Sequence, residues 1–293
     1  MSDSIAIRPL STAEDMRAVE GLQRLVWPGD ETEVVPAHML LAVAHGGGVV
    51  LGAFDGDRLI GLAFGFLGTD SDSPDRVAMA RLKHCSHMLA VHPDYRDRSV
   101  GYHLKVAQRA AVVLQGIRLI TWTYDPLQSR NAHLNIRRLG AVSRTYLREV
   151  YGEMRDGLNV GLPSDRFQVD WWITSHRVSS RLESQRPPLD LAHFLDAGAQ
   201  KLNPASLGAE DLPRPNDHPE TPAGPLALVE IPPDFARLKT HDLGLALAWR
   251  DHTRQVFEQA FASGYLVTDF VHLRGERVPR SYYLLSYGES TLG

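Results

Sequence analysis

The chain has 293 residues, of which 43% are hydrophobic and 23% are charged, and this composition excludes disordered, collagen-like and coiled-coil proteins. The length predicts about two domains of ordinary size. The 31 Lys and Arg residues against 35 Asp and Glu residues leave a formal net charge of −4. Without a block of like charges, this balance disfavours a general binder of nucleic acid or of an anionic membrane surface.

The cysteine content and the start of the chain indicate a cellular compartment. A single cysteine, Cys85, excludes an intramolecular disulfide and a cysteine-cluster metal site. The N-terminal residues lack the basic and apolar stretches of a secretory signal, and no run of about 18 apolar residues could span a bilayer. We therefore expect a cytoplasmic protein with no metal and no membrane partner.

The first predicted elements are a helix and a β-hairpin. Ser11 and Glu14 match the capping-box pattern that begins a helix, and apolar residues follow at helical spacing at Met16, Val19, Leu22 and Val26. Two apolar runs from Val49 onward flank a turn with Asp55 and Gly56, which predicts the hairpin. The glycines at 46–48 are interpreted as a flexible turn, because no Gly-Lys-Ser/Thr sequence follows them.

A strand–helix–strand unit is predicted next, after a polar loop at 70–75. Residues 84–91 form a strand that Pro93 ends, and apolar residues at Leu104, Ala107, Ala111 and Leu114 mark the buried face of a helix that begins near Val100. Gly116 stands at the helix C-terminus. Residues 117–123 are rich in β-branched side chains and follow at once, so the two strands are expected to be parallel.

The rest of the chain predicts further helices and strands. A helix at 129–139 stops at Gly140, and two strands follow near 142–151 and 167–174. Ten of the 18 prolines lie between 187 and 233. We therefore divide the α/β chain into a first domain at 1–178, a Pro-rich connecting region at 179–225 without much regular structure, and a smaller α+β extension at 226–293.

The extension repeats the order of elements seen earlier. A strand at 226–231, a helix that ends at Gly264 and strands at 265–273 and 281–285 match the order strand, helix, glycine, strand, strand found from 117 to 174. From this shared order of elements we hypothesise that the two segments arose by a degenerate internal duplication.

The stretch from His87 to Leu104 carries the chemistry. A strand leads into a turn with two arginines and small residues, and then directly into a helix. Backbone N–H groups of the turn and of the first helical turn converge there, where the helix dipole is positive, so an anion such as a pyrophosphate fits. Small residues allow close approach, and arginines add charge-assisted hydrogen bonds. The alternative is an ordinary strand-to-helix loop with solvated arginines.

These residues resemble motif A of the GNAT (GCN5-related N-acetyltransferase) superfamily. The segment Arg96-Asp-Arg-Ser99-Val-Gly101 matches the motif, except that Ser99 stands where the family has a glycine. The resemblance covers about 5–174, and the segments 122–135 and 161–167 resemble a predicted-acetyltransferase subgroup with a C-terminal extension. It implies the GNAT fold, in which helices flank a mixed, twisted sheet.

The resemblance also implies a function and binding residues. The chain would transfer an acetyl or succinyl group from acetyl-CoA or succinyl-CoA to the amine of a small molecule such as an amino acid. Backbone groups of Leu89 and Val91 would hold the pantetheine arm in a splay between two strands, and Asn131 would replace a family asparagine. The pyrophosphate would be held by Arg96, Arg98, Ser99, Val100 and Gly101.

Direct attack of an amine on the thioester needs a base, an oxyanion partner and a proton for the thiolate. Strand alternation predicts Cys85, His87, Leu89 and Val91 on one face, and the ordinary histidine pKa near 6.5 suits His87 as the base. The alternative for His87 is a core residue. The family tyrosine that protonates the thiolate is replaced by Ile136, so we consider Tyr124 and Tyr151 for this role.

Other side chains are candidates for binding the acceptor or a partner. Arg166 could clamp a carboxylate, or could pair with Asp165 to stiffen a loop. Of Trp171 and Trp172, which alternate along a strand, one belongs to the core and the other, Trp172, lines the acceptor pocket or an interface such as that of a homodimer.

Two other functions stay open. One is a non-catalytic acyl-CoA-binding regulatory module, and the other is a structural protein with a closed wedge. A metal pair of His84 and His87 is disfavoured because the two side chains would face opposite sides of the strand.

Overall fold

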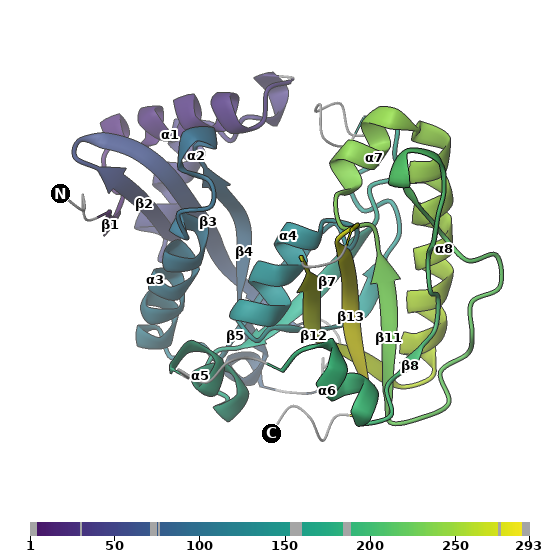
Figure 1. Cartoon of the computed structure of the whole chain (residues 1–293). Coiled ribbons are helices and arrows are strands. Elements are labelled where there is room, and N and C mark those ends of the chain that lie inside the picture. The colour runs from purple at the N-terminus through teal and green to yellow at the C-terminus, as the bar shows by residue number, and fades with distance from the viewer. Residues whose placement is uncertain are drawn as a thin grey trace. The chain divides into compact units, whose positions relative to one another are not determined.

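The computed structural model describes residues 5–29, 31–70, 75, 77–152, 160–183, 189–274 and 277–288, and it has the predicted mixed α/β character (Figure 1). The chain forms two compact units. The first contains residues up to Trp122 together with Trp172–Thr174, and the second contains most of the chain from Thr123 onward. This division differs from the predicted domain boundary at 178. The predicted loop at 70–75 lies largely outside the described residues.

The sheet of the first unit has the strand order β1-β2-β3-β4-β5. Neighbours are antiparallel from β1 to β4, and β5 is parallel to β4, so the predicted hairpin and the predicted strand–helix–strand unit are confirmed. The strands are β1 Ala6–Pro9, β2 Val49–Asp55, β3 Arg58–Thr69, β4 Leu82–Val91 and β5 Leu119–Tyr124. The helices are α1 Ala13–Val26, α2 Ala37–His45 and α3 Val100–Leu114, with short 3-10 turns at Glu31–Glu33, Ala78–Arg81 and Pro93–Tyr95.

Helix α1 begins one residue later than predicted. The Thr12 Oγ1 atom accepts a hydrogen bond from the Asp15 backbone N–H at 3.1 Å, and the Asp15 carboxylate accepts one from the Thr12 N–H at 3.2 Å. The capping box is therefore Thr12 with Asp15, because the Asp15 carboxylate reaches the free N–H groups from this position. The apolar face of α1 packs in a core with Leu40 of α2 and with Leu62, Phe64 and Ala90 of the sheet.

Helix α3 covers the opposite face of the same sheet. A Cβ built on Gly61 of β3 would lie 2.9 Å from Leu104 Cδ1 and 3.0 Å from Val100 Cγ1, so a glycine is needed where the helix approaches the strand. Because side chains alternate along a strand, Gly61 and its neighbour Leu62 point to different faces. The sheet of this unit is therefore covered by α1 and α2 on one face and by α3 on the other.

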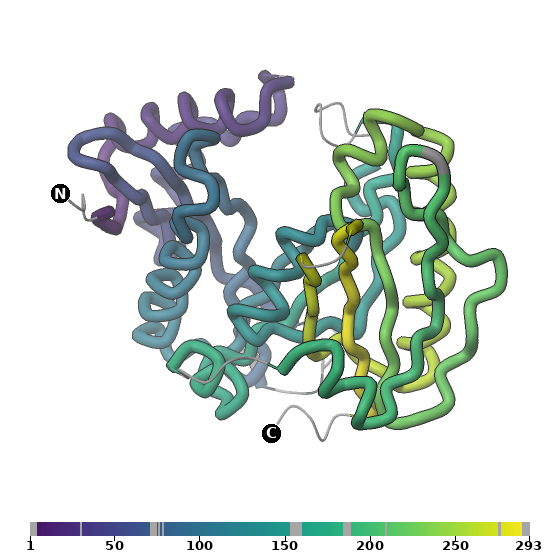
Figure 2. Tube along the Cα trace, viewed as in Figure 1, coloured from purple at the N-terminus to yellow at the C-terminus, as the bar shows by residue number. Residues whose placement is uncertain are grey.

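The second unit has a sheet with the order β7-β6-β12-β13-β11-β8, and its chain runs from teal to yellow in Figure 2. Its strands are β6 Val142–Leu147, β7 Arg166–Trp172, β8 Gln200–Lys201, β11 Leu226–Ile231, β12 Tyr265–Leu273 and β13 Arg280–Tyr287, and β9 Ser206–Leu207 pairs separately with β10 Pro213–Arg214. Its helices are α4 Ser129–Ala132, which continues as a π-helix at His133–Arg138, α5 His176–Glu183, α6 Leu191–Asp196, α7 Phe235–His241 and α8 Leu243–Ala262, with a 3-10 turn at Ala209–Asp211.

The predicted connecting region at 179–225 contains regular structure, which corrects that expectation. It holds α6, β8 and the β9–β10 pair, and β8 joins the main sheet through parallel pairing with β11. Leu202 and Asn203 that follow β8 are buried. Prolines restrict the length of regular elements, but they leave room for short strands and a short helix between them.

The element order on which the duplication hypothesis rests is present in the structure. Gly140 and Gly264 both adopt positive φ, +74° and +89°, at the end of a helical segment that precedes two antiparallel strands. Strand β8 has two residues opposite β11, and β4 has two residues opposite β5, in both cases in parallel register. Superposition of the two halves would test the duplication.

Candidate functional site

The candidate site lies along β4 and the turn that follows it. Within the described residues, β4 pairs with β5 only where His84 lies opposite Ile120 and Cys85 lies opposite Thr121. Strand β4 nevertheless continues to Val91. Its edge on the β5 side therefore lacks the parallel pairing beyond Cys85 that would satisfy its backbone groups within the sheet, so this edge can accept an extended ligand.

The turn between β4 and α3 has an unusual backbone. Asp97 and Ser99 adopt φ of +66° and +59°, in the left-handed region, and Ser99 is the N-cap residue of α3. Ser99 thus takes the conformation that a glycine adopts without strain. The first N–H groups of α3, at Val100 and Gly101, have no partner within the helix and point toward this turn.

Two arginines flank this turn, as the sequence predicts. Arg96 and Arg98 are exposed, and the Arg98 guanidinium lies 4.9 Å from the centroid of the Tyr95 ring. The Tyr95 hydroxyl donates a hydrogen bond of 2.6 Å to Asp55, which ties the turn to the β2–β3 hairpin. The positive end of the helix and the guanidinium groups together suit a phosphate.

His87 lies at a β-bulge in β4. Phe64 of β3 faces Met88 and the next residue, Gly65, faces Ser86, so His87 is the extra residue in β4. Its ring packs against Phe64 and Phe66 with centroid distances of 5.8 and 6.0 Å. His87 is exposed and is therefore not a core residue. Partial desolvation against the two rings lowers its pKa below the usual 6.5, so the imidazole is largely neutral at pH 7 and can accept a proton.

The bulge corrects the predicted alternation along β4. Val91 lies opposite Gly61 and Leu89 opposite Ala63, on the face that α3 covers. Cys85 lies opposite Phe66, on the face that carries Phe64 and His87. Cys85 and His87 therefore share one face and Leu89 with Val91 the other, because an extra residue reverses the alternation.

A buried polar cluster beneath β4 was missed by the sequence reasoning. It consists of His84 and Ser86 of β4, Lys105 and Gln108 of α3, and Trp122 of β5. Apolar spacing could not reveal it, because two of the buried residues of α3 are polar. The buried face of α3 is Val100, Leu104, Lys105, Gln108 and Val112, whereas the predicted Leu114 is 89% exposed.

The two tyrosines considered as proton donors belong to the second unit. Tyr124 is buried, its hydroxyl lies 3.1 Å from that of Tyr283, and burial raises its pKa far above 10. This environment argues against Tyr124 as the acid for a thiolate. Tyr151 is exposed, and its hydroxyl lies 2.7 Å from Thr123 Oγ1.

The predicted acceptor residues have different environments. Arg166 is buried, donates a hydrogen bond of 2.9 Å to the Asp165 carbonyl, and lies 5.5 Å from the centroid of the Tyr151 ring. Trp171 is buried and Trp172 is 42% exposed, so the predicted division of the two tryptophans is present. Asn131 is exposed on α4.

The carboxylate next to Arg166 has another cationic partner. Asp165 accepts two hydrogen bonds from Arg254 of α8, at 2.8 and 3.1 Å. A second buried pair joins Asp125 to Arg250 of α8 through two hydrogen bonds of 2.8 Å. These pairs hold α8 in the second unit. The Asp165 carboxylate pairs with Arg254 and not with Arg166, which corrects the Asp165–Arg166 pair considered from the sequence.

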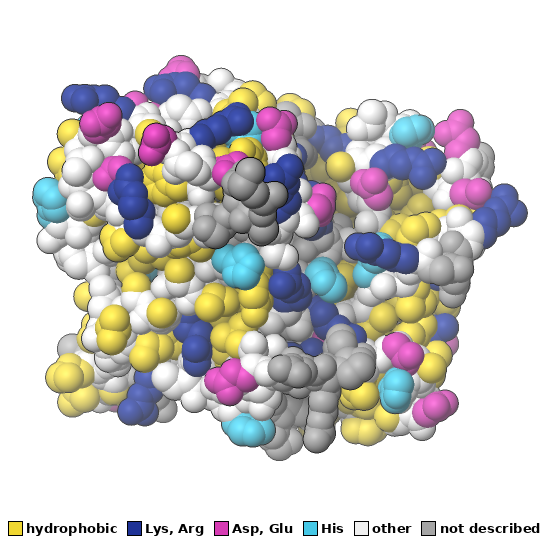
Figure 3. All heavy atoms as spheres, turned by 60° about the vertical axis from the view of Figure 1, so that its left-hand side comes forward, with side chains coloured by type: hydrophobic (Ala, Val, Ile, Leu, Met, Phe, Trp, Pro, Cys, Tyr) yellow, Lys and Arg dark blue, Asp and Glu magenta, His cyan; other side chains and the backbone are white. Residues whose placement is uncertain are grey.

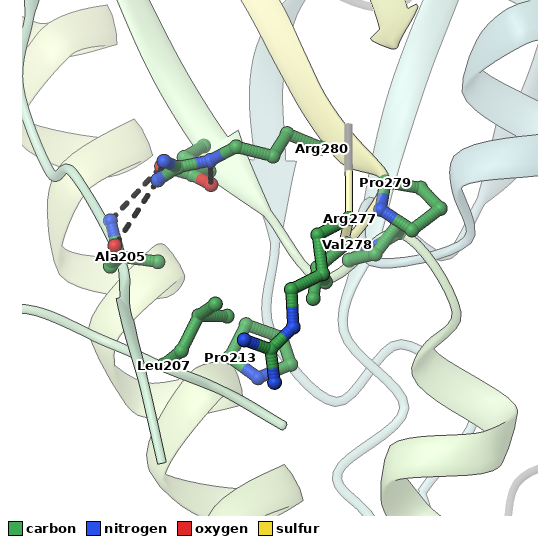
Figure 4. Close-up of a pocket in the computed structure, with 9 residues that line it drawn as sticks. Ala205, Leu207, Pro213, Arg277, Val278, Pro279 and Arg280 are labelled. Atoms are coloured by element: carbon green, nitrogen blue, oxygen red, sulfur yellow. Dashed lines mark hydrogen bonds and ion pairs between the residues drawn. The ribbon is translucent and has the colours of Figure 1, made fainter. Parts of the chain in front are cut away.

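A cavity of about 120 Å³ lies in the second unit, next to one of about 320 Å³ that shares four of its lining residues. The walls of the smaller cavity are largely apolar. At its edge, the guanidinium of Arg280 pairs with Glu230 and donates a hydrogen bond to the Ala205 carbonyl (Figure 4). Arg277 pairs with Asp211 at 3.2 Å. None of the predicted site residues lines either cavity, and the three charged residues that line the smaller one, Glu230, Arg277 and Arg280, all take part in ion pairs.

Three general features of the described residues complete the picture. No group of three or more His, Cys, Asp or Glu side chains among them could hold a metal ion. None of the helices in the described part of the chain is long and apolar enough to cross a bilayer. On the face drawn in Figure 3, basic and acidic side chains are interspersed.

No family model and no curated sequence matches this chain, but solved structures are similar to it. An acetyltransferase of the GNAT family from Desulfovibrio desulfuricans is 19% identical with a TM-score of 0.45, over 58% of this chain and 100% of that one. The ribosomal-protein-S18-alanine N-acetyltransferase of Escherichia coli is 13% identical with a TM-score of 0.44, over 64% and 100%. The Salmonella typhimurium protein yncA, solved with acetyl-CoA, is 14% identical with a TM-score of 0.44, over 64% and 98%. All three are described as acetyltransferases.

Proposed function

We propose that this chain is an acyl-CoA-dependent N-acyltransferase of the GNAT type. It transfers an acetyl or succinyl group to the amine of a small molecule such as an amino acid. The observation that supports this most is that β4 separates from β5 after Cys85 and leads through a left-handed turn into the N-terminus of a 15-residue helix. An extended arm with a pyrophosphate at one end suits this combination of a free strand edge and an anion site.

The donor would be held by the backbone more than by side chains. Leu89 and Val91 offer strand N–H and C=O groups along the free edge of β4. At the turn, the N–H groups of Val100 and Gly101 would receive the phosphates, and Ser99 holds the left-handed conformation that aims them. The exposed arginines of the turn would add charge-assisted hydrogen bonds.

His87 is the proposed general base. The neutral imidazole takes a proton from the acceptor ammonium, and the resulting amine attacks the thioester carbonyl. A C–N bond forms, the C–S bond breaks, and the leaving thiolate takes up a proton. The Phe64 and Phe66 rings pack against the imidazole, and this partial desolvation lowers the pKa of His87 and favours the unprotonated form at neutral pH.

The proton for the thiolate separates this function from the alternative. Tyr124 is buried and bonded to Tyr283, an observation that favours a module that binds acyl-CoA without reacting. Tyr151, an exposed residue whose hydroxyl lies beside Thr123 Oγ1, and water are the remaining proton donors that we propose for the reaction. For an acceptor that carries a carboxylate, Arg166 is the proposed partner, and Trp172 offers exposed apolar surface to the acceptor.

Two measurements on the purified protein test the proposal. Calorimetric titration with acetyl-CoA, succinyl-CoA and free CoA is expected to show binding in the micromolar range. Thiol release during incubation with acyl-CoA and a panel of amines and amino acids is expected to exceed the rate without amine. Tight binding without thiol release would favour the regulatory module, and no binding of any of the three compounds would refute the donor site.

A matched pair of glycine variants makes the binding test specific. Gly101→Leu puts a bulky side chain at the first turn of α3 and is expected to abolish donor binding while the protein stays folded. Gly21→Leu places the same side chain on α1, where nothing lies within 4 Å of the new Cβ, and donor binding is expected to be unchanged. Equal loss of binding in both variants would contradict the placement of the phosphates.

A further inference from the structure

A lysine lies buried in the interior of the first unit. Lys105 of α3 is 1% exposed, although lysine is rarely buried without partners. Its ammonium nitrogen donates hydrogen bonds to Ser86 Oγ at 3.0 Å and to Gln108 Oε1 at 2.9 Å, and it lies 3.6 Å from the centroid of the Trp122 ring. The proposed acyl transfer makes no use of this group, so its burial needs another explanation.

The partner of Lys105 is the residue that precedes the bulge. Ser86 lies opposite Gly65, and its hydroxyl also donates to Gln108 Oε1 at 2.9 Å. Two side chains of α3 therefore hold Ser86 on the helix side of β4. His87, the next residue, is consequently directed to the opposite face, toward Phe64.

The bulge decides which of two residues faces α3. If β4 continued regularly from the pair of Phe64 with Met88, His87 would lie opposite Gly65 and would point toward the helix. Ser86 would then face away. A regular strand keeps the ladder hydrogen bonds that a bulge disrupts, so the bulged register needs compensating contacts, and the hydrogen bonds to Ser86 supply them. A one-residue change of register reverses every side chain.

A glycine makes room for the same register. A Cβ built on Gly65 would lie 2.3 Å from His84 Nε2, and Gln108 Nε2 lies 3.2 Å from that atom. His84 and Ser86 thus both point toward α3 in the bulged arrangement and both contact Gln108. Lys105 and Gln108 therefore contact two alternate residues of β4, His84 and Ser86. In a strand shifted by one residue, both side chains would face away from α3 and these contacts would be lost.

We propose that Lys105 and Gln108 are positioning residues that hold the β4 bulge and so direct the His87 imidazole away from α3. This proposal rests on the proposed function only in giving His87 the role of base. The same helix begins at the turn that would hold the donor's phosphates, so α3 sets both the donor and the direction of the base.

The test compares Lys105→Met, which keeps an unbranched side chain but removes the ammonium group, with the same substitution in β4, Lys83→Met, as the control. Ser86→Ala is the second variant, because it removes only a hydroxyl and tests the contact if Lys105→Met does not fold. Two readouts are measured: nuclear Overhauser contacts between the His87 and Phe64 rings, and kcat with the dissociation constant of the donor.

In Lys105→Met and Ser86→Ala, the contact between the His87 and Phe64 rings is expected to be lost. The value of kcat is expected to fall at least about tenfold, as displacement of a catalytic group by about 1 Å does, with donor affinity within about twofold of the wild type. Lys83→Met should match the wild type in each readout. Retention of the ring contact in both variants overturns the proposal, whatever happens to kcat. Because the ring contact is read without substrate, it still decides the matter if the wild type proves to have no transferase activity.

Discussion

Acid should weaken the first unit through His84, and His84→Gln should remove this effect. His84 is fully buried and its ring accepts a contact from Gln108, and its Nδ1 atom has no hydrogen-bond partner among the described residues. Burial, and secondarily the positive charge of Lys105, lower the pKa of His84 from 6.5 to about 4. The folded chain therefore resists a proton that the unfolded chain binds readily.

The size of the effect follows from these two pKa values. Because the pKa is lower in the folded state, the stabilising contribution is complete above about pH 6.5 and is lost as the pH falls toward 4. At pH 5 the unfolded state is favoured about 30-fold more than at high pH, which corresponds to about 2 kcal/mol, and at pH 4 the loss is about 3 kcal/mol. Below the folded-state pKa the slope flattens.

Urea unfolding between pH 7.5 and 4, followed by tryptophan fluorescence, measures this dependence. The quantity compared between the two proteins is the change in the free energy of unfolding with pH, because His84→Gln also changes the stability at neutral pH. The other histidines contribute equally to both proteins and cancel. His38→Gln is the matched control, because His38 is exposed on α2, and its slope should equal that of the wild type. If His84→Gln loses the same free energy between pH 7 and 5 as the wild type, the burial argument is refuted.

Three further predictions concern the base, the turn and the second unit. The lowered pKa of His87 predicts that kcat/KM falls only as the pH drops through a value below 6.5. His87→Ala should abolish this fall of kcat/KM at acid pH. An unchanged fall in the variant excludes His87 as the base. Ser99→Gly removes about 1 kcal/mol of left-handed strain and adds a similar entropic cost to folding, so calorimetry should find the affinity for acyl-CoA unchanged. Ser99→Val places a β-branched side chain at φ +59°. This variant should weaken acyl-CoA binding at least about tenfold, or about 1.4 kcal/mol. Asp125→Ala leaves the buried Arg250 guanidinium without its carboxylate and should cost about 3–5 kcal/mol in urea unfolding; a cost below 1 kcal/mol would show that the pair has little influence.

Elements that depend on near neighbours in the chain were predicted well. Asp55 and Gly56 predict the hairpin because a tight turn requires residues that tolerate unusual φ, and Gly56 has φ of +57°. The parallel pairing of β4 with β5 follows from a helix of 15 residues between two apolar strands. The glycine-like position of Ser99 in the turn also proved to have positive φ.

Features that depend on distant partners could not be predicted in this way. The bulge at His87 exists because Ser86 meets Lys105 and Gln108 of α3, and strand alternation contains no information about such contacts. Likewise, Tyr124 looked like a free proton donor, but a residue from a strand far along the chain, Tyr283, lies against it.

The order of most elements, the α/β class and the strand–turn–helix connection after β4 could be predicted from the amino-acid sequence, because turns, caps and apolar periodicity act over a few residues. Which side chains of β4 face α3, which polar groups are buried and which candidate side chains remain accessible became clear from the folded chain alone. The physical reason is that burial and register depend on the surface that each element meets, and His87 owes its direction to a helix that begins thirteen residues after it.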